Sequence, residues 1–134
     1  MTQSIYERQA QFFSALAHPV RLNILDILTQ GEACVCHLKA ILRLRQAYIS
    51  QQLAILKEAG LIIDRKEGLY VYYSLADADI PHLLQEARRC VAQITGDQIL
   101  QSFTPPKYDE ITCDCPACRA KRSHLQPFPP TPNT

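Results

Sequence analysis

The sequence has little glycine and no long apolar run, and each shortage excludes a class of function. Its 134 residues include only four glycines, and these do not form the glycine-rich loop that cradles a phosphate group. Nowhere do 18 apolar residues follow one another, so we expect no membrane span. No nucleophile stands in a pattern with a general base. We therefore do not expect an enzyme.

The first residues also lack the features of a secretory signal. Residues 1–8, MTQSIYER, contain neither a basic run followed by an apolar stretch nor a cleavage site. We therefore expect a cytoplasmic protein whose thiols are reduced. The length supports one folded domain with a modest core.

Cysteine is plentiful and clustered, which indicates a site for a soft ion. The clusters are Cys34-Val35-Cys36 and Cys113-Asp114-Cys115-Pro116-Ala117-Cys118, with Cys90 alone between them. Thiolates are the preferred ligands of thiophilic ions. At such short gaps, and without a secretory signal, the cysteines favour a bound metal or metalloid over structural disulfides.

The hydrophobic pattern predicts a mainly helical fold with one β-hairpin. Apolar residues repeat at helical spacing over about residues 4–17, 19–31, 34–42, 46–59 and 79–94. Two runs of β-prone residues, 61–66 and 69–75, flank Glu67-Gly68 and predict the hairpin. Seven of the nine prolines occur from Pro105 onward. We therefore divide the chain into a folded domain, residues 1–97, and an irregular Pro-rich, Cys-containing C-terminal tail, residues 98–134.

Two helices joined by a short turn and followed by a hairpin form a winged helix-turn-helix, whose second helix enters the major groove of double-stranded DNA. The predicted second helix carries polar side chains that can read bases or bind phosphates, and the hairpin adds two basic residues; the candidates are Gln46, Tyr48, Ser50, Gln51, Gln52, Arg65 and Lys66. Net charge is only +1, but basic residues outnumber acidic ones between Lys39 and Lys66. The alternative is that this polar face is merely solvated.

The last predicted helix has an apolar stripe that the small domain cannot cover alone. A symmetric pairing with a second copy of the chain would bury it, so we predict a homodimer that joins through its terminal helices. The predicted interface residues are Leu83, Ala87, Cys90 and Ile94. Cys90 is interpreted as a packed thiol of this interface.

Four segments make the chain resemble the ArsR/SmtB family of winged-helix metal sensors over about residues 10–95. They are ALAHPVRLNIL at 15–25, CVCHL at 34–38, ISQQL at 49–53 and LKEAGL at 56–61. The resemblance implies a homodimer that represses its own promoter at an inverted-repeat operator. It also implies release of the DNA when an inducing ion binds.

The resemblance further suggests how the cysteines act. Arsenic-type members of the family carry Cys-x-Cys-x-x-Cys in the third helix, and its three thiolates hold As(III). Cys34 and Cys36 match the first two positions, but Lys39 occupies the third. The missing ligand is therefore expected from Cys113, Cys115 or Cys118, unless these three bind an ion by themselves. As(III) is the expected inducer, with Sb(III), Cd(II) and Pb(II) as alternatives.

The spacing of Cys34 and Cys36 suggests a mechanism. Residues two apart on an ideal helix point about 200° from each other. We therefore expect the start of the third helix to unwind when an ion binds, and this change to tilt the DNA-reading helix away from its groove.

Other uses of the cysteines remain open at this stage. Cys34 or Cys36 could bridge to Cys90 in a thiol-redox or persulfide sensor. Cys115 and Cys118 could form the pair of a thiol oxidoreductase, or the tail could hold an incidental zinc ion with His124. A zinc site at the dimer interface through Asp79 and His82 is not expected, because Gln93 and Thr95 stand where the second pair of ligands would lie.

Overall fold

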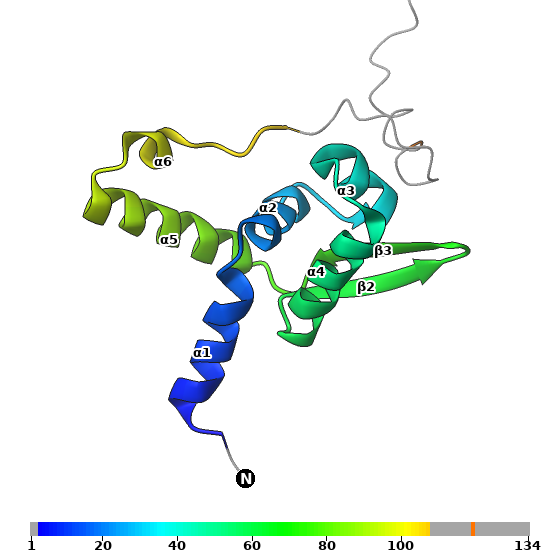
Figure 1. The fold of residues 1–134 in the computed structure, drawn as a ribbon, viewed down its shortest axis with the longest axis horizontal. Coiled ribbons are helices and arrows are strands. Elements are labelled where there is room, and N and C mark those ends of the chain that lie inside the picture. Colours follow the sequence, from blue (N-terminus) through cyan, green and yellow to red (C-terminus); the bar gives the residue numbers. More distant parts are fainter. Residues whose placement is uncertain (1–2, 108–118, 120–134) are drawn as a thin grey trace, which may run out of the picture.

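The computed structural model describes residues 3–107 and Arg119 of the chain. In order, the elements are α1 (Ile5–Leu16), α2 (Pro19–Leu28), β1 (Ala33–Cys34), α3 (Val35–Leu42), α4 (Gln46–Glu58), β2 (Ile62–Glu67), β3 (Tyr70–Leu75), α5 (Ile80–Thr95) and α6 (Gln98–Ser102). Figure 1 shows α3, α4 and the hairpin on one side of α2, with α5 and α6 on the other. The predicted mainly α fold with a β-hairpin wing is confirmed.

Local signals in the sequence set several helix ends. Pro19 occupies the first turn of α2, where its missing N–H needs no partner, and His18 caps the helix by accepting a hydrogen bond from the Val20 N–H. Gly60 follows the last residues of α4 with φ of +82°, a conformation that glycine adopts without a steric penalty. Pro19 and His18 therefore fix the start of α2, and Gly60 ends α4 shortly before β2 begins.

The wing contains a third strand that the sequence pattern does not reveal. The strand order is β1-β3-β2, and both pairings are antiparallel. β1 has only two residues, so it shows no alternation of apolar and polar side chains. The strand matters because it brings Cys34 into the sheet, opposite Tyr72 of β3.

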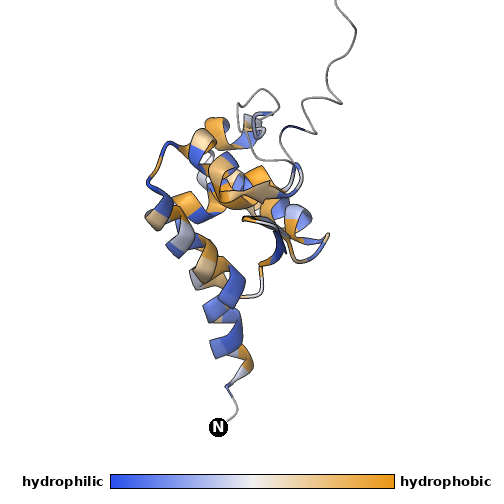
Figure 2. Ribbon diagram, turned by 90° about the vertical axis from the view of Figure 1, so that its right-hand side faces the viewer, coloured by the Kyte–Doolittle hydropathy of each residue, from blue (hydrophilic) through white to orange (hydrophobic). Residues whose placement is uncertain are grey.

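The core lies where α2, α3 and α4 meet the sheet. Its fully buried side chains include Ile24, Leu25, Leu38, Ile49, Leu53, Leu56, Leu61 and Tyr72. The outer turns of α1 are largely hydrophilic and stand clear of this hydrophobic centre (Figure 2). α4 therefore has one face fixed against the core and the opposite face available to a partner.

Residues 98–102 form a short helix, α6, where we predicted an irregular tail. The Asp97 carboxylate accepts a hydrogen bond from the Leu100 N–H at 3.0 Å and so caps α6. Arg88 of α5 pairs with Asp26 of α2 at 2.9 Å, and its guanidinium lies 4.8 Å from the centre of the Phe103 ring. These contacts join the chain after α5 to the folded domain, while the boundary at residue 97 stays a prediction.

None of the helices within residues 3–107 is both long enough and apolar enough to cross a membrane.

Candidate DNA interface and cysteine pair

The outward face of α4 carries polar side chains and no acid over its first two turns. Gln46, Ser50 and Gln51 are exposed, and Tyr48 is half-buried. Their amide and hydroxyl groups can donate and accept hydrogen bonds at base edges or phosphates. The structure therefore places four of the five predicted α4 residues where a bound duplex could reach them.

Gln52 is the exception, and its assignment to the DNA face is wrong. Gln52 is three residues after Ile49 and four before Leu56, so it lies on the buried face of α4. Gln52 is only 6% exposed, and its Oε1 accepts a hydrogen bond from Arg21 Nη1 at 2.9 Å. Arg21 also donates to the carbonyl oxygens of Ala15, at 2.6 Å, and Ser14, at 3.0 Å. Gln52 thus helps to tie α1, α2 and α4 together.

Tyr48 is held in place by His18. The Tyr48 Oη lies 3.3 Å from His18 Nε2, and His18 Nδ1 accepts a hydrogen bond from the Val20 N–H at 3.2 Å. Since Nδ1 is an acceptor, the proton of the neutral ring is on Nε2, which donates to Tyr48 Oη. The Tyr48 hydroxyl hydrogen can then be donated outward.

The basic residues of the interface fall into two groups. Lys57 pairs with Asp64 at 2.8 Å, and this hydrogen bond raises the pKa of the Lys57 ammonium. Arg65 pairs with Glu32 and Glu67, whereas Lys66 is exposed on the wing. In the part of the chain that the structure describes, no carboxylate pairs with Lys39, Arg43, Arg45 or Lys66.

Arg43 and Arg45 lie in the turn between α3 and α4, directly before the helix that we predict to read DNA. Both belong to the basic excess between Lys39 and Lys66, but they were not among the site residues that we predicted. Their position just before α4 could have identified them as phosphate-binding residues, because phosphates flank the groove that such a helix enters. We add both residues to the candidate interface.

The structure joins Cys34 and Cys36 in a disulfide, with their Cα atoms 5.4 Å apart. This differs from the reduced thiols that we predicted, and the pair can bind a thiophilic ion only after reduction. The expected 200° separation of the two side chains is also wrong. Cys34 is the N-cap of α3 and has extended backbone angles, φ −86° and ψ 167°, so it lies outside the helix. The two sulfur atoms therefore face each other without any unwinding.

The two cysteines differ in their surroundings. Cys34 is buried at 2% exposure, and its Sγ accepts a hydrogen bond from the His37 N–H at 3.3 Å. Cys36 is exposed on the first turn of α3. A solvent-borne ion or thiol would therefore meet Cys36 first.

Within residues 3–107 no group of three His, Cys, Asp or Glu side chains is arranged to hold a metal ion. The predicted ligands Cys113, Cys115 and Cys118 lie outside the described residues, and so does His124. Their role as donors of a third ligand, or as a separate site, stays a prediction.

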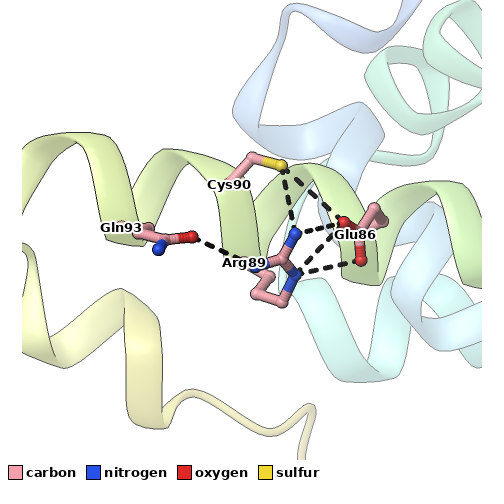
Figure 3. Close-up of polar contacts among 4 residues, drawn as sticks. All are labelled: Glu86, Arg89, Cys90 and Gln93. Carbon is pink, nitrogen blue, oxygen red and sulfur yellow. Dashed lines mark hydrogen bonds and ion pairs between the residues drawn. The ribbon is translucent and has the colours of Figure 1, made fainter.

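Cys90 lies on α5 beside a small polar cluster (Figure 3). Its Sγ is 3.8 Å from Glu86 Oε1 and 3.7 Å from Arg89 Nη2. Arg89 lowers the pKa of the Glu86 carboxyl by donating hydrogen bonds to it. Cys90 is half-buried and is not in a disulfide. α5 and α3 lie on opposite sides of α2 (Figure 1), and the alternative bridge from Cys34 or Cys36 to Cys90 is not formed in this structure.

Comparisons with known proteins agree with this architecture. The family model described as "Bacterial regulatory protein, arsR family" matches residues 18–64. Rv0081 of Mycobacterium tuberculosis, an uncharacterized HTH-type transcriptional regulator, is 35% identical over 99 residues, which are 73% of this chain and 87% of that protein. The chain belongs to the ArsR family.

Two solved structures extend the likeness to three dimensions. The crystal structure of Rv0081 matches this chain with a TM-score of 0.66 and covers 73% of this chain and 99% of that one. The solution structure of Mb0332 from Mycobacterium bovis has a TM-score of 0.59 at 29% identity, over 80% of this chain and 99% of that one. It is described as a homodimeric winged helix-turn-helix DNA-binding domain from a possible ArsR-family regulator.

A named repressor is also among the relatives of this ArsR-family chain. The arsenical resistance operon repressor of Escherichia coli is 42% identical over 88 residues, which are 60% of this chain and 72% of that protein. The ArsR family consists of transcriptional regulators, which are not enzymes. The oxidoreductase alternative drawn from Cys115 and Cys118 gains no support from these relatives.

The contacts of Gln52 lead to a stability prediction. Gln52→Leu should lower the free energy of unfolding by about 1–3 kcal/mol, because it leaves one donor of Arg21 without its partly buried acceptor. Urea unfolding at a fixed protein concentration measures the change. The matched control is Gln51→Leu, which alters an exposed position and should shift stability by less than about 0.5 kcal/mol. Equal effects of the two variants would contradict the assignment.

Proposed function

We propose that this chain is a transcriptional repressor that binds its operator as a homodimer and releases it when arsenite or antimonite binds cysteine thiolates. The observation that carries the proposal is the position of Cys34 and Cys36. Their sulfur atoms lie together at the start of α3, the helix that immediately precedes the DNA-reading helix α4. An ion bound there would act directly on the helix-turn-helix.

DNA binding is supported by the surface around α4. The outward residues Gln46, Ser50 and Gln51 can read base edges, while Arg43 and Arg45 flank the start of the helix and can bind phosphates. Lys66 extends the basic surface onto the wing. A dimer would present two such helices about 34 Å apart, one turn of the duplex, to an inverted repeat.

Dimerisation is supported by apolar side chains that one copy leaves exposed on its terminal helices. On α5, Leu83 is 37% exposed, Val91 47% and Ile94 83%, and Ala87 is also exposed. On α1, Phe13 is 52% exposed. An apolar surface of this kind is costly in water and indicates contact with another protein surface. A second copy of the chain is the simplest partner because it offers the same stripe.

The chemistry of As(III) suits the cysteine pair. Arsenous acid, As(OH)₃, reacts with three thiols to form three As–S bonds and release three waters. Cys34 and Cys36 would supply two of these thiols, and we propose that Cys113, Cys115 or Cys118 supplies the third. The disulfide must first take up two electrons and two protons, which a cytoplasmic thiol reductant such as glutathione can provide.

Cd(II) and Pb(II) are alternative inducers, because they also bind thiolates. A thiol-redox repressor is a second candidate function, and the Cys34–Cys36 disulfide is the observation that favours it. In that case the oxidised and reduced forms of the pair, without any ion, would have different affinities for DNA. Titration of reduced and oxidised protein in the absence of metal separates the two functions.

We predict that Cys36→Ser retains operator binding but loses release by arsenite, because one of the two adjacent thiolates is gone. A coupling of about 3 kcal/mol in the parent protein corresponds to release by a factor of about 150. Fluorescence anisotropy on DNA from the chain's own promoter, with the protein kept reduced, measures both quantities. Cys90→Ser is the matched control and should release the DNA like the parent. A full response by Cys36→Ser would refute the proposed site.

The third ligand is tested with a variant in which Cys113, Cys115 and Cys118 are all serine. We expect this variant to bind the operator normally and to need a higher arsenite concentration for release, since two thiolates bind As(III) less tightly than three. The same anisotropy titration measures the shift. An unchanged arsenite midpoint would remove these cysteines from the site.

The basic turn gives a prediction for DNA affinity. Arg43→Ala and Arg45→Ala should each reduce the slope of log affinity against log salt by about 2 per dimer, because each removes one phosphate contact in both subunits. Anisotropy titrations between 50 and 200 mM salt, roughly the range over which such contacts are felt, measure the slope. Lys107→Ala, an exposed change after α6, should leave it unaltered. Unchanged slopes in both arginine variants would exclude the turn from the interface.

A further inference from the structure

Arg65, the wing residue proposed to bind phosphate, is already held by two carboxylates. Its Nε and Nη2 lie 3.3 Å and 2.5 Å from the two carboxylate oxygens of Glu32, and its Nη1 lies 2.6 Å from Glu67 Oε2. The guanidinium also lies 4.9 Å from the centre of the Tyr72 ring. Glu32 binds one edge of the guanidinium, Nε and Nη2, through both of its carboxylate oxygens, and so occupies a position that a DNA phosphate would take.

These ion pairs change the charge that the wing offers to DNA. The carboxylates of Glu32 and Glu67 offset the positive charge of the Arg65 guanidinium and so weaken its attraction for a phosphate. The hydrogen bonds that Arg65 donates to Glu32, and then to Glu67, raise the pKa of its guanidinium, which stays positively charged. The three side chains are between 32% and 65% exposed, and ion pairs this exposed are weak. A phosphate can therefore displace the carboxylates.

Glu32 is close in sequence to the cysteine pair. It precedes β1 directly, with only Ala33 between it and Cys34. Across the sheet, Cys34 is opposite Tyr72, and Tyr72 is opposite Arg65. Cys34, Tyr72 and Arg65 thus form one row across the three strands of the sheet. Glu32, just before the first strand, binds the arginine at the other end of this row.

We propose that Glu32 is a displaceable counterion that keeps Arg65 from DNA and connects the cysteine pair to the wing. In the DNA-bound dimer, Arg65 leaves Glu32 and binds a phosphate. Thiol capture at Cys34 fixes β1 in the arrangement where Glu32 holds Arg65, so it favours the DNA-free form. The connection to the cysteines rests on the proposed function, whereas the counterion role does not.

Glu67 provides a matched comparison within the same cluster. It also binds Arg65, but it lies at the end of β2 and is not attached to β1. Loss of Glu67 should therefore affect the charge of the wing without affecting the response to the inducer. Glu32 should affect both.

The test is a comparison of Glu32→Gln, Glu67→Gln and the parent chain by operator anisotropy, with and without saturating arsenite. Each exposed pair changes affinity by a factor of about 1.4 to 5 per subunit, so either variant should bind DNA about 2- to 25-fold more tightly as a dimer. Glu32→Gln should also reduce the 150-fold arsenite effect by at least tenfold. Glu67→Gln should keep it.

The second part of the test repeats the Glu32→Gln comparison in a chain that also carries Arg65→Ala. In this background, Glu32→Gln should no longer raise DNA affinity, because no guanidinium remains to be freed. An equal gain with and without Arg65 would overturn the counterion role. An unchanged arsenite effect in Glu32→Gln, beside a responsive parent, would overturn the connection to the cysteines. If the parent itself ignores arsenite, the proposed inducer is wrong, and the Arg65 arm still tests the counterion.

Discussion

The pairing of β1 with β3 is the contact on which the account depends. It is only two residues long, yet it holds Cys34 beside Tyr72 in the same sheet that forms the wing. At the other end of the same short segment, α3 begins and packs against α4. The cysteine pair is therefore connected to both parts of the predicted DNA interface: through α3 to the reading helix α4, and through β1 to the hairpin.

This placement replaces the unwinding mechanism suggested by the sequence. Because Cys34 caps α3 from outside, the two sulfur atoms meet while the helix is intact. An inducer therefore needs no melted turn. It needs only to bind one arrangement of β1 and α3 more tightly than the arrangement required on DNA, and its effect on DNA affinity cannot exceed that difference. Exposed ion pairs on the wing suit such a system, since they are weak enough to be exchanged.

The helices with a repeating apolar pattern could be predicted from the sequence. Contacts between residues that are far apart in the sequence could not. Repeating apolar residues located α2 and α4 to within a few residues. The two-residue strand β1 has no period to detect, and the tail helix α6 depends on one capping aspartate. Gln52 was misplaced because its residue type suggested DNA, while its angular position on α4 pointed to Arg21. Glu32 and Arg65 are 33 residues apart, so only the fold reveals their pairing.

The most direct test of the central claim is the affinity of the reduced homodimer for arsenite, measured free and then saturated with operator DNA. Binding linkage requires the two ligands to weaken each other by the same factor. Operator DNA should raise the dissociation constant for arsenite about 150-fold, which matches the loss of DNA affinity that arsenite causes. Equal arsenite affinities in the free and operator-bound states would show that the cysteine pair and the DNA interface are not coupled.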